Sequence, residues 1–483
     1  MSGDLQRVEL DEGVLDEPVS PRTAETDRRR RRWARGLVAG AAVVVGGLVV
    51  AQSVIDARER AAFEELQAVP GVLSPIGDEL TVAFEVASPW WLDLPGDRST
   101  LLTVVWSDDG PRLRSTDAAT GTLRWDVPLA PDAPRGDGRG AQVHCGSGLA
   151  GDRAVVACLD TDGRYEWDEA DDLVVLPATY ARVVVHAQDD GARLVAWDLE
   201  EPVDGIAVHE DQVFVLARDG EDVRLSAHDV ATGEENWQRT FLGAAREPSD
   251  GDPGNAWLSQ GGGAVVVSGL RGDDRVVTYS GQVLPARTVS WGGADGPALF
   301  VSRGGASVEV LLDGVLGKEI EREPVPTSVD DGSLGQVVFT TSRGLSAWHA
   351  VTGERLWSWG TENSADVGLA AFDGALVLRG DVYAWGMSRV VAFDGEDGRE
   401  LWSRAASPDD RMIRSVETDG RRLYVLSEDS LSSRSETAVE ALTFAGRSEG
   451  QIRMPSGVIW TSRLGDQLWT RRDEGSDVLV VLR

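Results

Sequence analysis

Carboxylate side chains gather in one short stretch of the chain, where they could bind a metal ion. Asp160, Asp162, Glu166 and Asp168 surround Gly163. Hard cations such as Ca²⁺ take six to eight oxygen ligands, and carboxylates supply such oxygens. A solvated acidic loop that binds nothing has the same composition. We therefore keep these four carboxylates as weak candidates for a metal site and assign no metal to the chain.

Sequence patterns for catalysis are few. Residues 446–450 match the G-x-S-x-G pattern of a nucleophile elbow, but that elbow joins a strand to a helix, and here two strands are expected. No P-loop or dinucleotide-binding fingerprint occurs. The histidines are scattered and lack metal-ligand spacing; they are His144, His186, His209, His228 and His349. We assign no catalytic residue.

Cys145 and Cys158 are the two cysteines of the chain, and they flank a turn centred on Gly151 and Asp152. If the hairpin has a two-residue loop, the two cysteines lie directly opposite each other. Facing strands can satisfy the Cα separation of about 4.4 to 6.8 Å that a disulfide needs. The spacing therefore predicts a structural disulfide across two strands, with two unpaired buried thiols as the alternative.

A repeated turn organises most of the chain. In each copy a Gly, usually preceded by Thr, is followed four residues later by a Trp, and alternating apolar residues surround the pair. This recurrence predicts an internal repeat of three or four antiparallel strands. The copies are Gly121 with Trp125, Gly233 with Trp237, Gly353 with Trp357, and Gly398 with Trp402.

The spacing of these tryptophans predicts the fold class. They are 112, 120 and 45 residues apart, which divides into repeats of roughly 40 to 56 residues, near the length of a propeller blade. A segment after Ile459 and a strand after Glu79 could together form a split blade that closes the ring. We predict an all-β propeller of about eight four-stranded blades, with seven to nine allowed. A β-sandwich with surface tryptophans is the alternative.

One repeat carries a known signature. Ala227, Asp229, Thr232, Gly233 and Trp237 match A-x-D-x-x-T-G-x-x-x-W, so the chain resembles the pyrroloquinoline-quinone-like (PQQ-like) β-propeller repeat family over about residues 79–483. The resemblance implies that the Trp of each repeat docks between adjacent blades and that the turn Gly is left-handed. These roles would fall on the four tryptophans and four glycines named above.

The resemblance also bears on cofactors. Quinone-dependent dehydrogenases of this family need two adjacent cysteines against the quinone, a catalytic Asp, and Glu and Asn ligands for calcium. This chain has no adjacent cysteines. The resemblance therefore favours a non-catalytic member without a cofactor, and bound PQQ or Ca²⁺ is the alternative.

The N-terminal part predicts a membrane anchor. Residues 36–55 contain no charged side chain and, at about 1.5 Å per residue, can cross a hydrocarbon layer of about 30 Å. Because arginines precede the segment in excess, the N-terminus is expected in the cytoplasm and the propeller outside. A cleaved signal peptide and a buried helix are the alternatives. The expected parts are a disordered cytoplasmic tail (1–35), a transmembrane helix (36–55), a helical stalk (56–78) and the propeller (79–483).

The charge balance limits the partners. The net charge of −33, with Lys318 as the single lysine, argues against nucleic-acid binding, which needs a basic surface. The abundance of Ala, Gly, Val, Asp and Arg indicates a GC-rich genome, such as that of an actinobacterium, with a halophile as the alternative.

These observations predict a single-pass membrane protein with an extracytoplasmic propeller. We expect it to bind a protein or a small ligand as a non-catalytic scaffold, similar to outer-membrane assembly propellers. Because propellers host many unrelated activities, a quinone- or metal-dependent dehydrogenase is the alternative.

Overall fold

The computed structural model divides the chain into two compact units, residues 1–65 and residues 66–483. The predicted tail, apart from Trp33, and most of the predicted transmembrane segment lie outside the described residues. Among the residues that are described, no helix is both long and apolar enough to span a bilayer. The structure describes Trp33, residues 52–54 and 57–58, and residues 60–483 except 88–99, 108–109, 130–142, 163, 168–172, 177–179, 246–255, 286–287, 291–297, 303–306, 322, 342–343, 361–370, 407–410, 430–436, 456–459 and 472–477.

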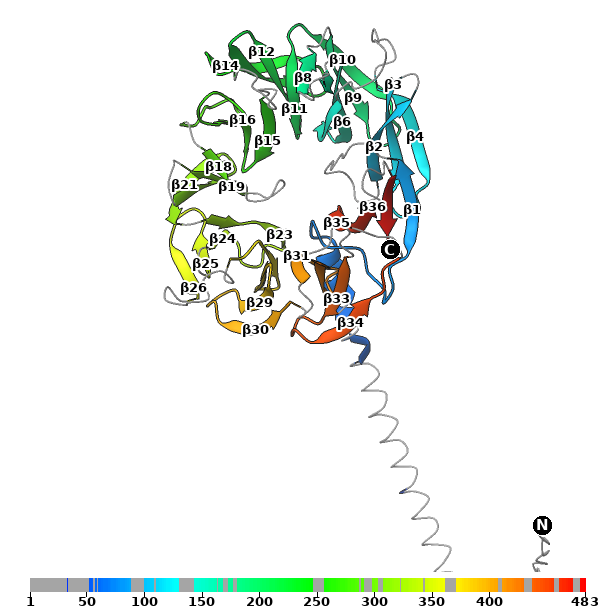
Figure 1. Cartoon of the computed structure of the whole chain (residues 1–483), viewed down its shortest axis with the longest axis vertical. Helices are drawn as coiled ribbons and strands as arrows, with labels where there is room; N and C mark the ends of the chain where they lie inside the picture. The colour runs from blue at the N-terminus through cyan, green and yellow to red at the C-terminus, as the bar shows by residue number, and fades with distance from the viewer. Residues whose placement is uncertain are drawn as a thin grey trace, which may run out of the picture. The chain divides into compact units, whose positions relative to one another are not determined.

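The second unit is a β-propeller. Its described residues form nine blade sheets that follow one another around a ring (Figure 1). The first four blades are β2 (Thr100–Ser107), β3 (Gly110–Asp117) and β4 (Leu123–Pro128); β5 (Val143–Ala150), β6 (Arg153–Thr161), β9 (Ala181–Ala187) and β10 (Arg193–Leu199); β11 (Val203–His209), β12 (Gln212–Asp219), β13 (Asp222–Asp229) and β14 (Glu235–Phe241); and β15 (Trp257–Gly261), β16 (Ala264–Ser268) and β17 (Arg275–Thr278).

Blades 5 to 8 continue the ring. They are β18 (Thr288–Ser290), β19 (Ala298–Ser302), β20 (Ser307–Leu312) and β21 (Val315–Glu321); β22 (Glu323–Val325), β24 (Val337–Thr341), β25 (Leu345–His349) and β26 (Arg355–Trp359); β23 (Thr327–Asp330), β27 (Gly374–Leu378), β28 (Asp381–Gly386), β29 (Arg389–Asp394) and β30 (Glu400–Ala405); and β31 (Arg411–Thr418), β32 (Leu423–Asp429), β33 (Ala438–Leu442) and β34 (Ser448–Ile452). Strand β23 pairs in parallel with β27, whereas the other strands within blades pair antiparallel.

The ninth blade joins the two ends of the propeller sequence. It consists of β35 (Trp460–Leu464), β36 (Gln467–Arg471), β37 (Val478–Leu482) and the early strand β1 (Val82–Ala87). Strand β1 pairs with β37 in a register that places Phe84 opposite Val481. The predicted split blade therefore exists. The count of eight was one short, because this blade has no glycine turn before its outermost strand to mark it.

Hydrophobic packing joins successive blades. Each of nine core clusters combines residues of two neighbouring blades, and the cluster between blades 6 and 7 contains Phe339, Trp357 and Phe393. Period-two alternation places these side chains on the faces of each sheet, so every sheet is covered on both sides. Burial between blades thus supplies the core of a ring without an exposed terminal blade.

The tryptophans of the repeat dock on the next blade. Each lies on the outermost strand of its blade and donates its indole N–H to a backbone carbonyl of the following blade. The four bonds run from Trp125 to Gln188 (2.9 Å), from Trp237 to Tyr279 (3.0 Å), from Trp357 to Gly395 (2.8 Å) and from Trp402 to Phe444 (2.8 Å).

Each of these tryptophans also packs against a glycine of the next blade. The φ angles of the predicted turn glycines are +70° at Gly121, +74° at Gly233, +66° at Gly353 and +72° at Gly398. A methyl group on Gly398 would lie 2.5 Å from the ring of Trp357. The glycine is therefore required twice, for its left-handed backbone and for the space that the indole occupies.

Where the repeat is degenerate, residues outside the Gly-to-Trp pattern pack on the turn glycine of the next blade. Trp197 packs on Gly233, Phe84 of the closing blade packs on Gly121, and the aliphatic stem of Lys318 packs on Gly353. Sequence reasoning missed these three residues because their turns lack the Thr-Gly-to-Trp spacing. Packing of a side chain on the turn glycine therefore occurs in more blades than the Gly-to-Trp spacing indicates.

Two glycine variants of blade 7 test the docking contact. Gly398 and Gly380 both have positive φ, +72° and +84°, but only Gly398 touches a tryptophan, and a methyl group on Gly380 would meet nothing within 4 Å. We expect G380A to lower the free energy of unfolding by about 1–2 kcal/mol, the cost of a left-handed alanine. We expect G398A to lower it by a further 1–3 kcal/mol or so through overpacking, measured by urea unfolding. Equal losses would contradict the docking contact.

Candidate functional site

The predicted acidic loop is divided by the fold. Asp160 lies on β6 and is buried, and its carboxylate accepts a hydrogen bond from the hydroxyl of Tyr180 at 3.2 Å. Asp162 accepts the backbone N–H of Tyr180 at 3.1 Å. Both carboxylates thus hold the start of β9. The side chain of Glu166 and all of Asp168 lie outside the described residues. In the part of the chain that is described, no three His, Cys, Asp or Glu side chains are arranged to hold a metal ion.

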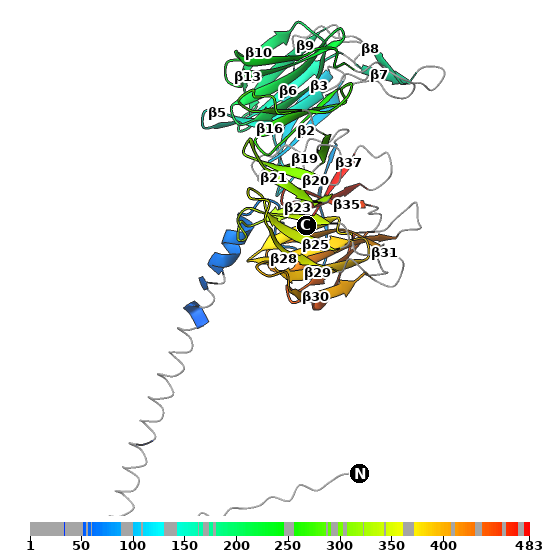
Figure 2. The same ribbon diagram turned by 90° about the vertical axis from the view of Figure 1, so that its left-hand side faces the viewer.

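A hairpin stands out beside this loop. Strands β7 (Arg164–Trp167) and β8 (Leu173–Leu176) form a two-stranded sheet of their own, inserted between β6 and β9. Figure 2 shows them at one side of the ring. The sequence pattern predicted a degenerate copy of the repeat from Leu173, but β8 pairs with β7 outside the blade.

The two cysteines are joined in blade 2. Cys145 on β5 lies directly opposite Cys158 on β6, with the two Cα atoms 4.0 Å apart and the sulfur atoms bonded. Cys158 is fully buried against the core shared with blade 1. The bond links the two innermost strands of one blade, which is a structural position.

The other residues considered for catalysis form hydrogen bonds that stabilise the fold. Ser448, of the G-x-S-x-G pattern, lies on strand β34 and donates to Glu440 at 2.5 Å. His186 and His228 each form a hydrogen bond with the carbonyl of a turn glycine, Gly191 at 3.0 Å and Gly233 at 3.2 Å. Burial lowers the pKa of His186, which favours the neutral ring. These contacts stabilise turns between strands.

Residues 66–80 form a segment that we call the N-terminal strap. Its backbone bonds to two adjacent blades, from Leu73 N–H to the carbonyl of Thr418 (2.7 Å) and from Ser74 N–H to that of Asp466 (2.6 Å). Val72 and Leu73 are fully buried. Sequence reasoning placed most of this segment in a stalk, but its apolar residues complete the cores of blades 7 to 9.

A buried polar cluster fixes the strap. Tyr424 donates to the carboxylate of Asp419 at 2.8 Å, and Arg422 bonds to the carbonyl of Ile76 and pairs with Asp78 at 3.2 Å. Burial, with the nearby Asp419 charge, raises the pKa of Tyr424, so its hydroxyl keeps its proton and remains a donor. Such networks stabilise only when their members are satisfied.

The topology gives the ring two distinct faces. We call the face with the Gly121, Gly233, Gly353 and Gly398 turns the turn face. The strap also lies there, because Thr418 ends β31 and Asp466 lies in the β35–β36 turn, which is at the same end of the blade. We call the opposite face, where one blade connects to the next, the connection face.

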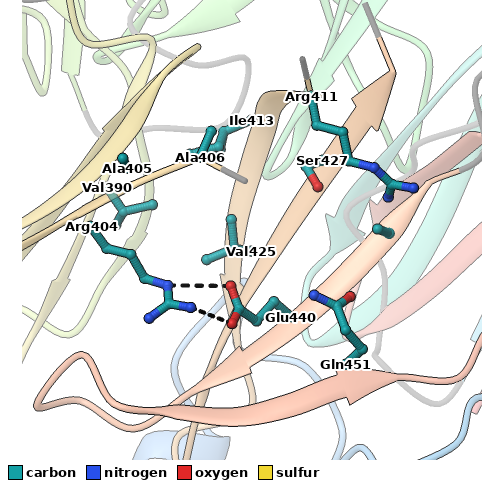
Figure 3. Close-up of a pocket in the computed structure, with 11 residues that line it drawn as sticks. Val390, Arg404, Ala405, Ala406, Arg411, Ile413, Val425, Ser427, Glu440 and Gln451 are labelled. Atoms are coloured by element: carbon teal, nitrogen blue, oxygen red, sulfur yellow. Dashed lines mark hydrogen bonds and ion pairs between the residues drawn. The ribbon is translucent and has the colours of Figure 1, made fainter. Parts of the chain in front are cut away.

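A cavity opens between blades 7 and 8. Its volume is about 200 Å³, and Figure 3 shows the side chains around it. Val390, Ile413 and Val425 form apolar walls, while polar groups from five strands converge on the space. Those polar residues are Arg404, Arg411, Ser427, Glu440 and Gln451.

An ion pair crosses this cavity between the blades. Arg404 on β30 bonds to Glu440 on β33 through Nε (3.3 Å) and Nη2 (2.5 Å) (Figure 3). The exposed fractions of the two side chains are 35% and 22%, so the pair is partly shielded from water. Sequence reasoning missed this cavity. The signal was the residue two positions after each repeat Trp, which is Trp359 in blade 6 but Arg404 in blade 7.

Comparison with known proteins identifies the family. The family described as outer membrane protein assembly factor BamB matches residues 109–284 and 341–481. The chain belongs to this BamB family. The unmatched residues 285–340 include blade 5, where Lys318 replaces the docking aromatic. No curated protein matches the chain in sequence.

Solved structures show a distant likeness to this BamB-family chain. BamB from Moraxella catarrhalis is 14% identical, with 84% of this chain and 99% of that chain covered and a TM-score of 0.39. The C-terminal WD40 domain of Sif2 is 11% identical, with 84% and 99% covered and a TM-score of 0.40. A europium-containing methanol dehydrogenase is 12% identical, with 76% and 91% covered and a TM-score of 0.32. At these identities and TM-scores we take no conclusion from the likeness.

Removal of the disulfide tests its structural role. The double variant C145S/C158S removes a bond between cysteines that are 13 residues apart in sequence. The chain-entropy model gives a loss of about 3 kcal/mol in the free energy of unfolding for a loop of roughly this length. We expect reductant to lower the stability of the natural chain by a similar amount and to leave the variant unchanged. Reductant that acts equally on both proteins would contradict a formed bond.

Proposed function

We propose that this chain is a membrane-anchored, extracytoplasmic scaffold that binds a protein partner without catalysis. The observation that carries the proposal is the BamB family match, which spans most of the propeller. The family takes its description from an assembly factor, a role that consists of holding other proteins. The chain's own chemistry is compatible, since His186, His228 and the serine of G-x-S-x-G are engaged in turns and strands.

The strap bears on which face of the ring a partner uses. It covers part of the turn face through its backbone bonds to Thr418 and Asp466. We therefore assign the partner to the connection face. Its exposed apolar side chains include Met387, in the β28–β29 turn, and Leu242, after β14, which are 54% and 80% exposed.

Site-specific photo-crosslinking tests the scaffold role and shows which face of the ring contacts a partner. A photoreactive amino acid is placed at Met387 or Leu242 on the connection face, and at Val315 or Val351 on the turn face, which are 65% and 44% exposed. In cells we expect discrete protein adducts from the connection face and few from the turn face. Adducts from the turn face alone, or from neither face, would contradict the proposal.

A second measurement separates the scaffold from the dehydrogenase alternative. Purified full-length protein is titrated with PQQ and Ca²⁺ by calorimetry, and its absorbance spectrum is recorded. We expect no saturable binding. Stoichiometric binding together with alcohol- or sugar-dependent dye reduction would show an enzyme and refute the scaffold.

A further inference from the structure

Two neighbouring blade junctions differ at equivalent positions. Between blades 6 and 7, Trp359 contacts Phe393 edge-on, with ring centroids 5.3 Å apart, beside the fully buried Val391. Alignment on the docked tryptophans Trp357 and Trp402 places Arg404 where Trp359 stands. Alignment on the carbonyls that accept their indole bonds, Gly395 and Phe444, places Glu440 at the position of Val391.

The junction between blades 6 and 7 is packed with apolar side chains, whereas the junction between blades 7 and 8 has an ion pair beside a cavity. A tryptophan fills the connection-face half of the first junction, whereas the thinner arginine side chain and Ala405, Ala406 and Ala438 leave a cavity of about 200 Å³ in the second. A partly buried ion pair is weak evidence for stability, because desolvation offsets the Coulomb attraction. The same fold builds a filled junction one blade earlier, so stability does not require the charged arrangement.

The charges of the cavity favour an anion. Glu440 already accepts bonds from Arg404 and from Ser448. Arg411 lies across the cavity from Arg404 (Figure 3) and forms no ion pair with any residue that the structure describes. Ser427 and Gln451 add a hydroxyl and an amide to the wall. Among the residues that line the cavity, two guanidinium groups stand against one carboxylate.

The size and walls of the cavity limit the ligand. Its volume lies below the roughly 300–1,000 Å³ typical of small-molecule sites, so it suits a short group. Val390, Ile413 and Val425 supply apolar surface beside the donors. Arginine recognises planar carboxylates well because its N–H groups match their two oxygens.

We propose that this cavity between blades 7 and 8 binds a carboxylate on a short aliphatic stem, held by Arg411 and by Arg404 against the walls of Val390, Ile413 and Val425. The carboxylate belongs either to a free small acid or to an acidic residue or C-terminus of a bound protein. The site opens towards the connection face, because Arg404 is near the end of β30 and Arg411 begins β31. This inference goes beyond the scaffold role, since a free acid can bind without any protein partner.

Calorimetric titration of the full-length protein with glutarate, and separately with an acetylated peptide ending in Glu, tests the site. We expect saturable binding of at least one probe. Tighter binding of the peptide would assign a chain-borne carboxylate, and tighter binding of glutarate a free acid. The cation 1,5-diaminopentane should not bind. Absence of saturation with both acids, or binding of the diamine alone, would overturn the proposal.

Three variants test the charge of the bound ligand and the place where it binds. E440Q removes the carboxylate that competes for Arg404, so we expect several-fold tighter binding. R411Q should weaken binding about tenfold, which corresponds to about 1.4 kcal/mol. R404W/E440V copies the filled junction between blades 6 and 7 and should abolish binding with an unchanged or higher Tm. R399Q, on an exposed arginine of the β29–β30 turn that does not line the cavity, is the matched control and should bind as the natural chain does. Weaker binding by E440Q would show a cation site instead.

Discussion

The structure depends on the docking of a side chain from the outermost strand of one blade into a left-handed glycine turn of the next blade, a contact that the described residues make at seven of the nine junctions. The indole bond from Trp357 to Gly395 and the close packing on Gly398 illustrate it. Because a single blade leaves both faces of its sheet apolar, it cannot be stable alone, and the contact sets the angle at which the next sheet covers it. Repetition around the ring then removes exposed sheet faces.

This constraint explains which features follow from the sequence. The glycine-to-tryptophan spacing is local, so Trp125, Trp237, Trp357 and Trp402 and their turns predicted the propeller. Its closure was predicted from the strands expected after Glu79 and after Ile459. The pairing of Cys145 with Cys158 was also predictable, because both lie within one hairpin. Local spacing carries no information where the docking residue is Phe84 or Lys318, so the degenerate blades could be located only by their packing.

The cavity could not be predicted from local sequence spacing. Arg404 and Glu440 are separated by a whole blade boundary, and their pairing follows from the angle between two sheets. The N-terminal strap shows the same limit. Residues 66–78 have helical or linker composition, but their apolar side chains Leu66, Val72, Leu73 and Ile76 are buried against blades formed by the C-terminal part of the chain. Sequence patterns predict each repeat. The cavity and the N-terminal strap arise where the chain departs from the repeat, and they distinguish this protein from a propeller of identical blades. The recognition site that we propose lies at one of these departures.

The free energy of unfolding of Trp357→Ala, measured in urea beside Leu356→Ala, tests the central contact most directly. Trp357 is 7% exposed and bonds to the next blade, while the adjacent Leu356 on the same strand is 44% exposed. The account predicts a loss of about 3–5 kcal/mol for the tryptophan and a change within about 0.5 kcal/mol for the leucine. Similar small losses for both variants would contradict the role of inter-blade docking in holding the ring together.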